Sequence, residues 1–494
     1  MIMRKIIYFI TILISLNSCS DFLEVQPGLL VSVDEQLTTE TGVEEALRGM
    51  YLDLEATVTS ERVFIYPDLI GGNLSFSPDL DATPEVDIDN NFTNSYEFND
   101  MAMESEFQST YESYYNIINH INILLSRIND FNFLSTERIN QLQAELLTSR
   151  AYTHYLLSLK FSQHHGFTSN GSHLGIVYNT TPIEVAVDFP ARATVAENYQ
   201  SMKTDLDIAL QLYTDVPFID TRNPIGYFNE ISTRAIYSRI ALQMEDWQTA
   251  LDQSSNVINT SGIVLTPAIN YVEQWQSVDR INETLLSFNT PLASDNNGTT
   301  SSIQDFYSYS SPTLYEEYVV SLDLIELFEP GDIRSQLYSL QNIPTLINGN
   351  LISQDYYFTT KYGSTLLDDV RIASSRINVR LSEMYLIAAE SQERLSPGNS
   401  QSLIWLNDIR MRAGLASITN TNNVLEEIFL ERRRELAVEG FLLYDIARFK
   451  RDILRDNGCI ANVCNLNYPS NFFILPIPFE SIELNQNMIQ NEGY

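Results

Sequence analysis

The sequence predicts a mostly α-helical protein in which paired helices support long irregular loops and a few short strands. Three observations lead to this fold class. Apolar residues recur at spacings of three and four over long segments, which is typical of amphipathic helices. Several of these segments are separated by only a few residues, as antiparallel helix pairs require. Between them, residues 62–100 and 285–318 are irregular and rich in turn-forming residues.

The first predicted helix covers about residues 107–128. Its apolar residues follow one another at spacings of 4, 3, 4, 3, 4 and 3 and therefore lie on one face (Phe107, Tyr111, Tyr114, Ile118, Ile121, Leu125, Ile128). A second helix is predicted from Thr136, as its N-cap, to Phe161, and a third over residues 195–213.

Residues 232–260 predict a helical hairpin. The pattern breaks at residues 244–246 and restarts at Trp247 and Ala250. Close-packing alanines, a short break, an aromatic residue and another alanine are typical of tetratricopeptide helix pairs. Because no strict repeat period can be counted, an ordinary helical hairpin is the competing interpretation.

Three more helices are predicted near the C-terminus, over residues 380–395, 400–414 and 424–440. The last two end in Gly414 and Gly440, which suit a C-cap. A short strand is predicted at residues 285–290. No linker or change in composition divides the chain after residue 18, so residues 19–494 are expected to form one domain.

The first 18 residues predict a lipoprotein signal peptide. Arg4 and Lys5 precede an apolar run from Ile6 to Leu16, which is shorter than the roughly 20 residues that span a bilayer. The run ends in L-x-S-C, so we expect cleavage before Cys19 and lipidation of its thiol with acyl chains such as palmitate. An ordinary signal peptide with an incidental cysteine is the alternative.

Charge and cysteine content narrow the function classes. A formal net charge of −35 repels phosphate backbones and disfavours nucleic-acid binding. Cys459 and Cys464 form a C-x₄-C pair, which predicts a disulfide in an oxidising exterior or else two free thiols. The spacing is a poor zinc signature.

No catalytic motif was found, so we expect no enzyme activity. The five histidines show no ligand spacing typical of a metal site, although the last three lie close together in sequence (His120, His154, His164, His165, His173). Four aspartates in one loop offer a structural calcium site, with a solvated acidic loop as the alternative (Asp79, Asp81, Asp87, Asp89).

Several distinctive sequence stretches follow one another from near the N-terminus to the C-terminus. They include "SCSDFLEVQP", "AELLTSRAYTHYLL", "YYFTTKYG", "RINVRLSEMYLIAAES", "LNDIRMRAGL", "ERRRELAVEGFLLYDIARF" and "FILPIPFESIELNQNMIQNEGY". A further stretch carries D-L-x-x-x-F-x-x-x-D-x-R (Asp323, Phe328, Asp332, Arg334). This sequence resembles the SusD/RagB family of outer-membrane nutrient-binding lipoproteins.

The charged residues of these stretches have a structural interpretation. Arg380 and Glu383 stand three apart on one helix face and are expected to pair. Four others are expected to fix the packing of neighbouring helices (Glu431, Arg432, Glu435, Glu439). These stretches therefore identify a scaffold and not a ligand.

The resemblance implies a SusD-like superhelix of tetratricopeptide-like pairs on the cell surface. It implies a partner, a SusC-like TonB-dependent transporter, and an oligosaccharide ligand that is delivered unaltered. A peptide ligand, as in RagB-type relatives, is the alternative, and a lid whose main partner is the barrel is a third hypothesis.

The irregular stretches are where the resemblance places the ligand. Aromatic platforms and polar groups that orient hydroxyls are what a sugar site needs. The predicted platforms are Phe76, Tyr96, Tyr307 and Tyr309. The predicted polar groups are Asp68, Asn73, Asp79 and Asn297. These loops lack tryptophan, which weakens the case for starch and leaves peptides open.

Overall fold

The computed structural model describes residues 32–80, 84–184, 187–220, 224–277, 281–288, 303–362, 376–420 and 422–494. The expected signal segment and Cys19 lie outside the described residues. The chain divides into two compact units, residues 1–47 and 48–494. The first unit contains helix α2 (Val33–Gln36), capped by Ser32, and the start of helix α3 (Glu40–Thr59). All other elements belong to the second unit.

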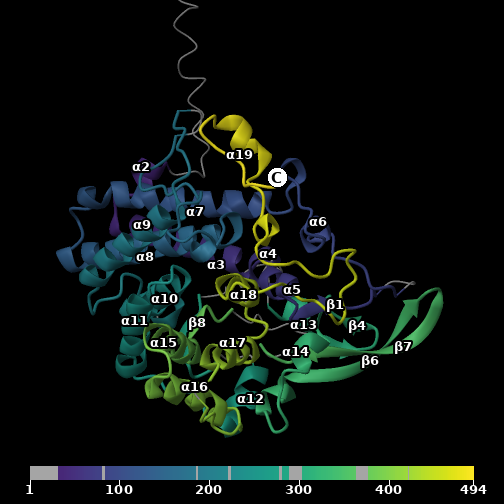
Figure 1. Ribbon diagram of the computed structural model, residues 1–494. Helices are drawn as coiled ribbons and strands as arrows, with labels where there is room; N and C mark the ends of the chain where they lie inside the picture. Colours follow the sequence, from purple (N-terminus) through teal and green to yellow (C-terminus); the bar gives the residue numbers. More distant parts are fainter. Residues whose placement is uncertain are drawn as a thin grey trace, which may run out of the picture. The chain divides into compact units, whose positions relative to one another are not determined.

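Long helices form the framework of the second unit (Figure 1). They are α7 (Gln108–Ser126), α8 (Thr136–Phe161), α9 (Val195–Leu212), α10 (Glu230–Gln243), α11 (Trp247–Thr260), α15 (Leu381–Leu395), α16 (Ser400–Arg412) and α17 (Val424–Glu435). Consecutive helices pack on one another: α7 on α8, α8 on α9, α10 on α11, and α15 on α16. This stacking confirms the predicted class of tetratricopeptide-like helix pairs.

Local caps set the helix ends. Ser135, and not Thr136, is the N-cap of α8, and its hydroxyl accepts a hydrogen bond from the Arg138 amide. The predicted break between α10 and α11 is present because Asp246 caps α11 through the Thr249 amide at 3.1 Å. Helix α17 ends before Gly440, since the following turn takes the left-handed backbone region at Val438.

Shorter helices connect these pairs and occupy part of the stretch predicted to be irregular. They are α4 (Glu61–Phe64), α5 (Tyr66–Gly71), α6 (Thr93–Tyr96), α12 (Ala268–Gln276), α13 (Gln304–Tyr307), α14 (Leu322–Ile325), α18 (Leu442–Arg448) and α19 (Phe479–Leu484). Single 3-10 turns are η1 (Ala102–Glu104), η2 (Ile128–Asp130), η3 (His165–Phe167), η4 (Pro224–Gly226), η5 (Ile333–Leu337) and η6 (Asn471–Phe473). Residues 63–78 are almost entirely buried, so much of the predicted loop region is core.

The strands form three small antiparallel sheets. They are β1 (Leu74–Phe76), β2 (Thr284–Leu286), β3 (Tyr309–Ser311), β4 (Leu314–Tyr315), β5 (Tyr318–Val320), β6 (Tyr338–Ile347), β7 (Asn350–Thr359) and β8 (Val379–Arg380). The main sheet has the order β1-β5-β7-β6, and β2 pairs with β8 and β3 with β4. The hairpin β6–β7, with ten residues in each strand, extends from the helices at the right of Figure 1 and was not predicted.

Buried ion pairs join the C-terminal helices. Arg380 pairs with Glu283 at 2.8 Å and with Glu435 at 2.6 Å, while Glu383 pairs with Arg239 at 2.6 Å. The predicted Arg380–Glu383 pair is therefore wrong, because Arg380 stands at the N-cap of α15 and turns toward the α17 segment. Four charged residues of the α17 segment each pair with a residue of another segment (Glu431, Arg432, Glu435, Glu439). These pairs confirm their predicted role in joining neighbouring elements.

Candidate functional site

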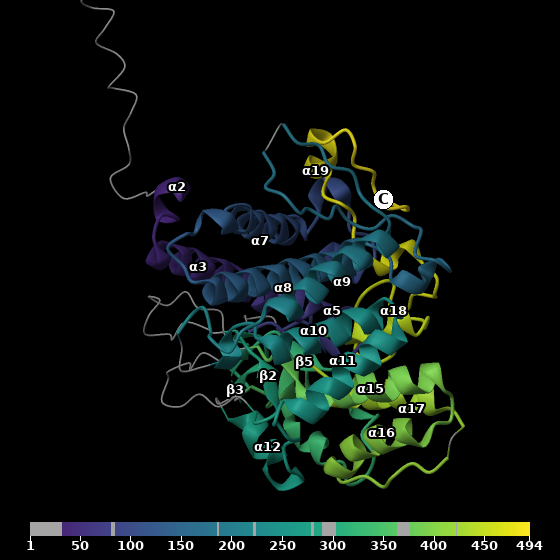
Figure 2. The ribbon, with the colours of Figure 1, turned by 90° about the vertical axis from the view of Figure 1, so that its left-hand side faces the viewer.

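An open pocket of about 450 Å³ lies between helix α7, the chain near residues 177–190 and the C-terminal helix α19. Figure 2 shows α7 and α19 at the same end of the second unit. We call it the α7–α19 pocket. Its volume lies in the usual range for small-molecule sites, roughly 300–1,000 Å³.

Helix α7 supplies one wall of the α7–α19 pocket. Residues 112, 116 and 119 stand four and three apart, so Glu112, Asn116 and Asn119 follow one another along a polar stripe. Tyr111 and Tyr115 flank this stripe, with their ring centroids 4.9 Å apart. The half-buried ring of Tyr115 is held in place because its hydroxyl donates to the Val177 carbonyl at 3.2 Å.

Backbone contacts fix the opposite walls. The Asn119 side chain accepts a hydrogen bond from the Ile183 amide at 2.8 Å, and the Asn485 side chain donates to the Pro190 carbonyl at 2.8 Å. Phe189 adds an aromatic ring that is 39% exposed. Among the described residues, the side-chain amide of Asn179 has no hydrogen-bond partner and is available to a ligand.

Such a wall suits a polar ligand with apolar faces. Aromatic rings stack on the flat faces of a sugar, and amides donate to and accept from its hydroxyls. This pocket was not predicted from the sequence, because its tyrosines lie on a helix and not in the irregular stretches. The signal that was present is the polar stripe beside two tyrosines on the predicted helix 107–128.

The structure places three predicted platforms in the core. Phe76, Tyr96 and Tyr307 are each 1% exposed. Phe76 packs edge-on against Tyr96 with centroids 5.1 Å apart, and the Arg455 guanidinium covers the Tyr96 ring at 4.1 Å. Because these three rings present no face to solvent, they do not serve as exposed platforms.

Asp68 and Asn73 are also buried and occupied by protein partners. Asp68 accepts hydrogen bonds from the Asn73 side chain at 2.6 Å and the Gly440 amide at 2.5 Å. Burial raises the pKa of Asp68 to about 6. The Asn73 side-chain oxygen accepts from Arg433 at 2.8 Å. These two residues therefore join α5 to the C-terminal helices.

The remaining predicted ligand residues lie elsewhere. Tyr309 is partly exposed and stacks on Tyr315 with centroids 6.3 Å apart. Asp79 is exposed, and Asn297 lies outside the described residues. Of the predicted ligand residues that the structure describes, Tyr309 and Asp79 are the accessible ones. They lie near the main sheet and do not line the α7–α19 pocket.

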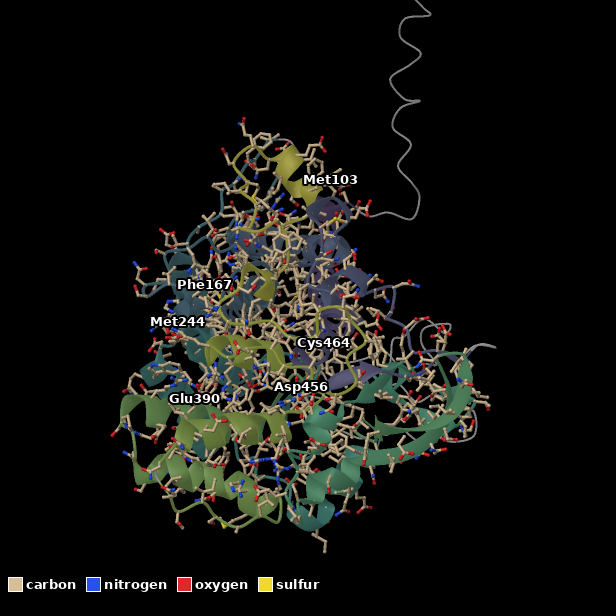
Figure 3. All side chains as sticks on the ribbon, turned by 45° about the vertical axis from the view of Figure 1, so that its right-hand side comes forward. Met103, Phe167, Met244, Glu390, Asp456 and Cys464 are labelled. Carbon is tan, nitrogen blue, oxygen red and sulfur yellow. A yellow bond between two sulfur atoms is a disulfide. The ribbon has the colours of Figure 1, made fainter. Side chains whose placement is uncertain are left out.

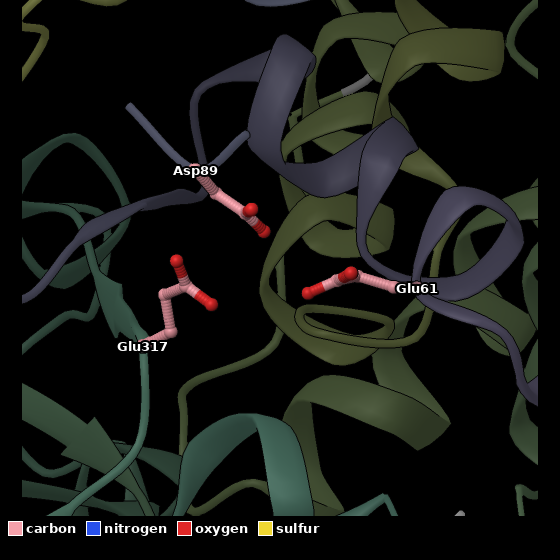
Figure 4. Close-up of side chains that lie close together, drawn as sticks. All are labelled: Glu61, Asp89 and Glu317. Carbon is pink, nitrogen blue, oxygen red and sulfur yellow. The ribbon is translucent and has the colours of Figure 1, made fainter. Parts of the chain in front are cut away.

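Three carboxylates converge beside the main sheet, as Figure 4 shows. Glu61, Asp89 and Glu317 each place an oxygen within 4.8 Å of the others. The Tyr318 hydroxyl bonds to both Glu61 and Asp89. Partial burial of its carboxyl group, and then repulsion from neighbouring carboxylates, raise the pKa of Glu317 to about 8, although the residue as a whole is exposed. Burial also raises the pKa of Glu61 to about 7.

Of the four aspartates considered for calcium, Asp89 belongs to this carboxylate group, and Asp81 lies outside the described residues. The calcium hypothesis stays a prediction. Three of the five histidines use ring nitrogens in protein hydrogen bonds: His154 with the Asn179 amide, His164 with Tyr468, and His173 with Thr168.

Cys459 and Cys464 form a disulfide in the loop after α18, where Figure 3 labels Cys464. Within the described residues, no helix combines the length and apolar character needed to span a membrane.

The fold and the site define a class: an α-helical repeat scaffold with one open, ligand-sized pocket among the cavities described here. Two family descriptions match the chain, "SusD family" over residues 330–494 and "Starch-binding associating with outer membrane" over residues 21–242. Since these matches cover both ends of the chain, the protein belongs to the SusD/RagB family.

Individual relatives agree in length and fold. The chain is 24% identical to SusD-like protein P2 and 21% identical to SusD-like protein P25 of Formosa agariphila, each over 99% of both chains. A SusD superfamily structure from Bacteroides vulgatus matches with a TM-score of 0.79 and 23% identity, covering 92% of this chain and 99% of that one. A putative sugar binding protein from the same organism matches with a TM-score of 0.76 and 23% identity, covering 92% and 98%.

Proposed function

We propose that this protein binds oligosaccharide at the outer membrane and passes it unaltered to a SusC-like TonB-dependent transporter. In this proposal residues 1–18 are a signal peptide, the lipidated Cys19 anchors the chain at the cell surface, and residues 19–494 work as one domain. The family match supports the carbohydrate class, because one matching family is described as starch-binding and associated with the outer membrane.

The observation that carries the proposal is the chemistry of the α7–α19 pocket. Its volume of about 450 Å³ accommodates a short oligosaccharide, and its walls combine tyrosine rings with side-chain amides. Tyr115 supplies the platform, and Asn116 and Asn179 reach hydroxyl groups. The part of the second unit that forms this pocket is held by hydrogen bonds to backbone carbonyls and amides, so little ordering is needed on binding.

Isothermal titration against a panel of polysaccharide fragments tests the proposal. Tyr115→Ala and Asn179→Ala are expected to weaken binding at least tenfold, because they remove the platform and an unpaired amide. Tyr309→Ala is the matched control, since it removes an aromatic ring near the main sheet. If Tyr309→Ala abolishes binding and Tyr115→Ala does not, the ligand binds at the sheet and the pocket assignment is wrong.

Peptide binding is the second candidate, and one feature favours it. Glu112 and Asp188 add carboxylates to the pocket wall, which suit the basic side chains of a peptide. Titration with a peptide library under the same conditions separates the two. Binding of a basic peptide, lost in Glu112→Gln, with no response to any glycan would replace the carbohydrate proposal.

A further inference from the structure

A second, much smaller cavity lies inside the helical part of the second unit. It has a volume of about 20 Å³ and shares no lining residue with the α7–α19 pocket. Four cationic side chains line it, each at most 6% exposed: Lys160 of α8, Arg239 of α10, Arg432 of α17, and Arg376. Among the described residues, no carboxylate lines this cavity.

Two of these cations have carboxylate partners outside the cavity wall. Arg239 pairs with Glu383 at 2.6 Å, and Arg432 pairs with Asp445 at 2.9 Å. The other two have none among the described residues. The ammonium group of Lys160 donates to the Tyr444 hydroxyl at 3.1 Å. The cavity wall therefore carries buried positive charge that its own ion pairs do not neutralise.

Arg376 contacts neutral groups. Its guanidinium donates to the backbone carbonyls of Val58 and Glu439, at 2.5 and 3.4 Å, and lies 5.0 Å from the centre of the Phe64 ring. An unpaired buried charge is strongly unfavourable in a protein interior.

The same wall carries hydrogen-bond donors without acceptors. Arg376 Nε, Arg432 Nη1 and the Tyr152 hydroxyl are buried and have no partner. Lys160 uses one of its three N–H groups in its single hydrogen bond. Because a buried unsatisfied donor costs about 1–3 kcal/mol, several such donors on residues that line one small cavity indicate a missing acceptor.

We propose that this cavity binds one small monovalent anion of halide size, with chloride as the physiological ligand. A volume of about 20 Å³ is close to what one water molecule needs, which favours a single small ion over sulfate or phosphate. An anion accepts hydrogen bonds from all the free donors and also compensates the unpaired cations, whereas a water molecule supplies no charge.

The ionisation of Lys160 agrees with this assignment. Burial, and then repulsion from Arg376, lower the pKa of Lys160 to about 7 when no anion is bound. A neighbouring anion favours the charged ammonium and raises this pKa. Anion binding thus keeps Lys160 protonated and stabilises the packing of α8 against α10 and α17.

Thermal unfolding in two sodium salts tests the proposal. At equal ionic strength, the melting temperature is expected to rise in a saturable manner with sodium chloride and not with sodium gluconate, whose anion is too large for the cavity. Lys160→Met should abolish the chloride-dependent part. Lys203→Met is the control, because Lys203 forms a partly exposed pair with Asp246 away from the cavity and should leave the chloride response intact.

Crystals grown in sodium bromide provide an independent readout that does not depend on a variant. The proposal predicts one anomalous peak between Lys160, Arg376 and Arg432. Equal melting temperatures in chloride and gluconate, or bromide crystals without a peak at this position, would overturn it.

Discussion

At the scale of single residues, buried charge characterises this molecule. Arg334, Arg380 and Arg432 are among its largest fully buried side chains. Arg334 and Arg380 pair with carboxylates far away in sequence, such as Glu431 and Glu283. Glu390, labelled in Figure 3, pairs with Arg448 of α18. Such pairs hold helices in one arrangement, because separating any pair leaves a charge without compensation.

Removal of one arginine tests this role. Arg380→Met removes a buried cation that Glu283, Glu435 and Glu439 share, and is expected to lower the free energy of unfolding by about 3–5 kcal/mol. Urea unfolding measures the change. Arg234→Met is the control: its pair with Glu230 is partly exposed, so its loss should cost at most about 1 kcal/mol. Equal effects of the two variants would refute the argument.

The carboxylate group of Figure 4 predicts a pH dependence. The folded protein raises the pKa of Glu317 from 4.5 to about 8, so its ionisation disfavours the folded state. Stability should therefore fall as pH rises between these two values. In Glu317→Gln this fall is expected to be smaller, which melting temperatures at pH 5 and pH 8.5 measure. An unchanged pH profile in the variant would contradict this explanation.

At the scale of elements, the hairpin β6–β7 depends on its turn. Asn348 and Gly349 have φ values of 51° and 75°, which suit a two-residue turn with the left-handed backbone region. A β-branched residue is disfavoured there by about 1–2 kcal/mol. Gly349→Val should therefore speed amide hydrogen exchange along β6 and β7, while Ser353→Ala, an exposed change on β7, should not. Equal protection in all three proteins would show that the turn does not limit the hairpin.

Long helices could be predicted from sequence because their apolar spacing is a local property. The burial of Tyr96 could not, since the arginine that covers its ring lies 359 positions further along the chain. The stretch around residues 62–100 looked irregular because its short helices and strand owe their stability to such distant contacts. Likewise, the stripe Glu112–Asn116–Asn119 is visible in the sequence, but only the packing of α19 nearby makes it one wall of a pocket.

At the scale of the whole molecule, the proposed function requires an anchor. Cys19→Ala should move the protein from the membrane fraction to the soluble fraction, because acyl chains contribute about 0.8 kcal/mol per buried CH₂. Cell fractionation together with mass spectrometry of the N-terminal peptide measures this. A wild-type protein that carries no acyl group would refute the anchor while leaving the pocket assignment open.

The most direct test of the central claim is to isolate the protein from its native membrane with its associated proteins and to identify the bound ligand by mass spectrometry. We predict an intact oligosaccharide together with a TonB-dependent transporter, and loss of the oligosaccharide, but not of the transporter, from the Tyr115→Ala variant. Recovery of a shortened glycan, or of the same glycan in undiminished amount from Tyr115→Ala, would contradict the claim that the α7–α19 pocket holds a sugar without altering it.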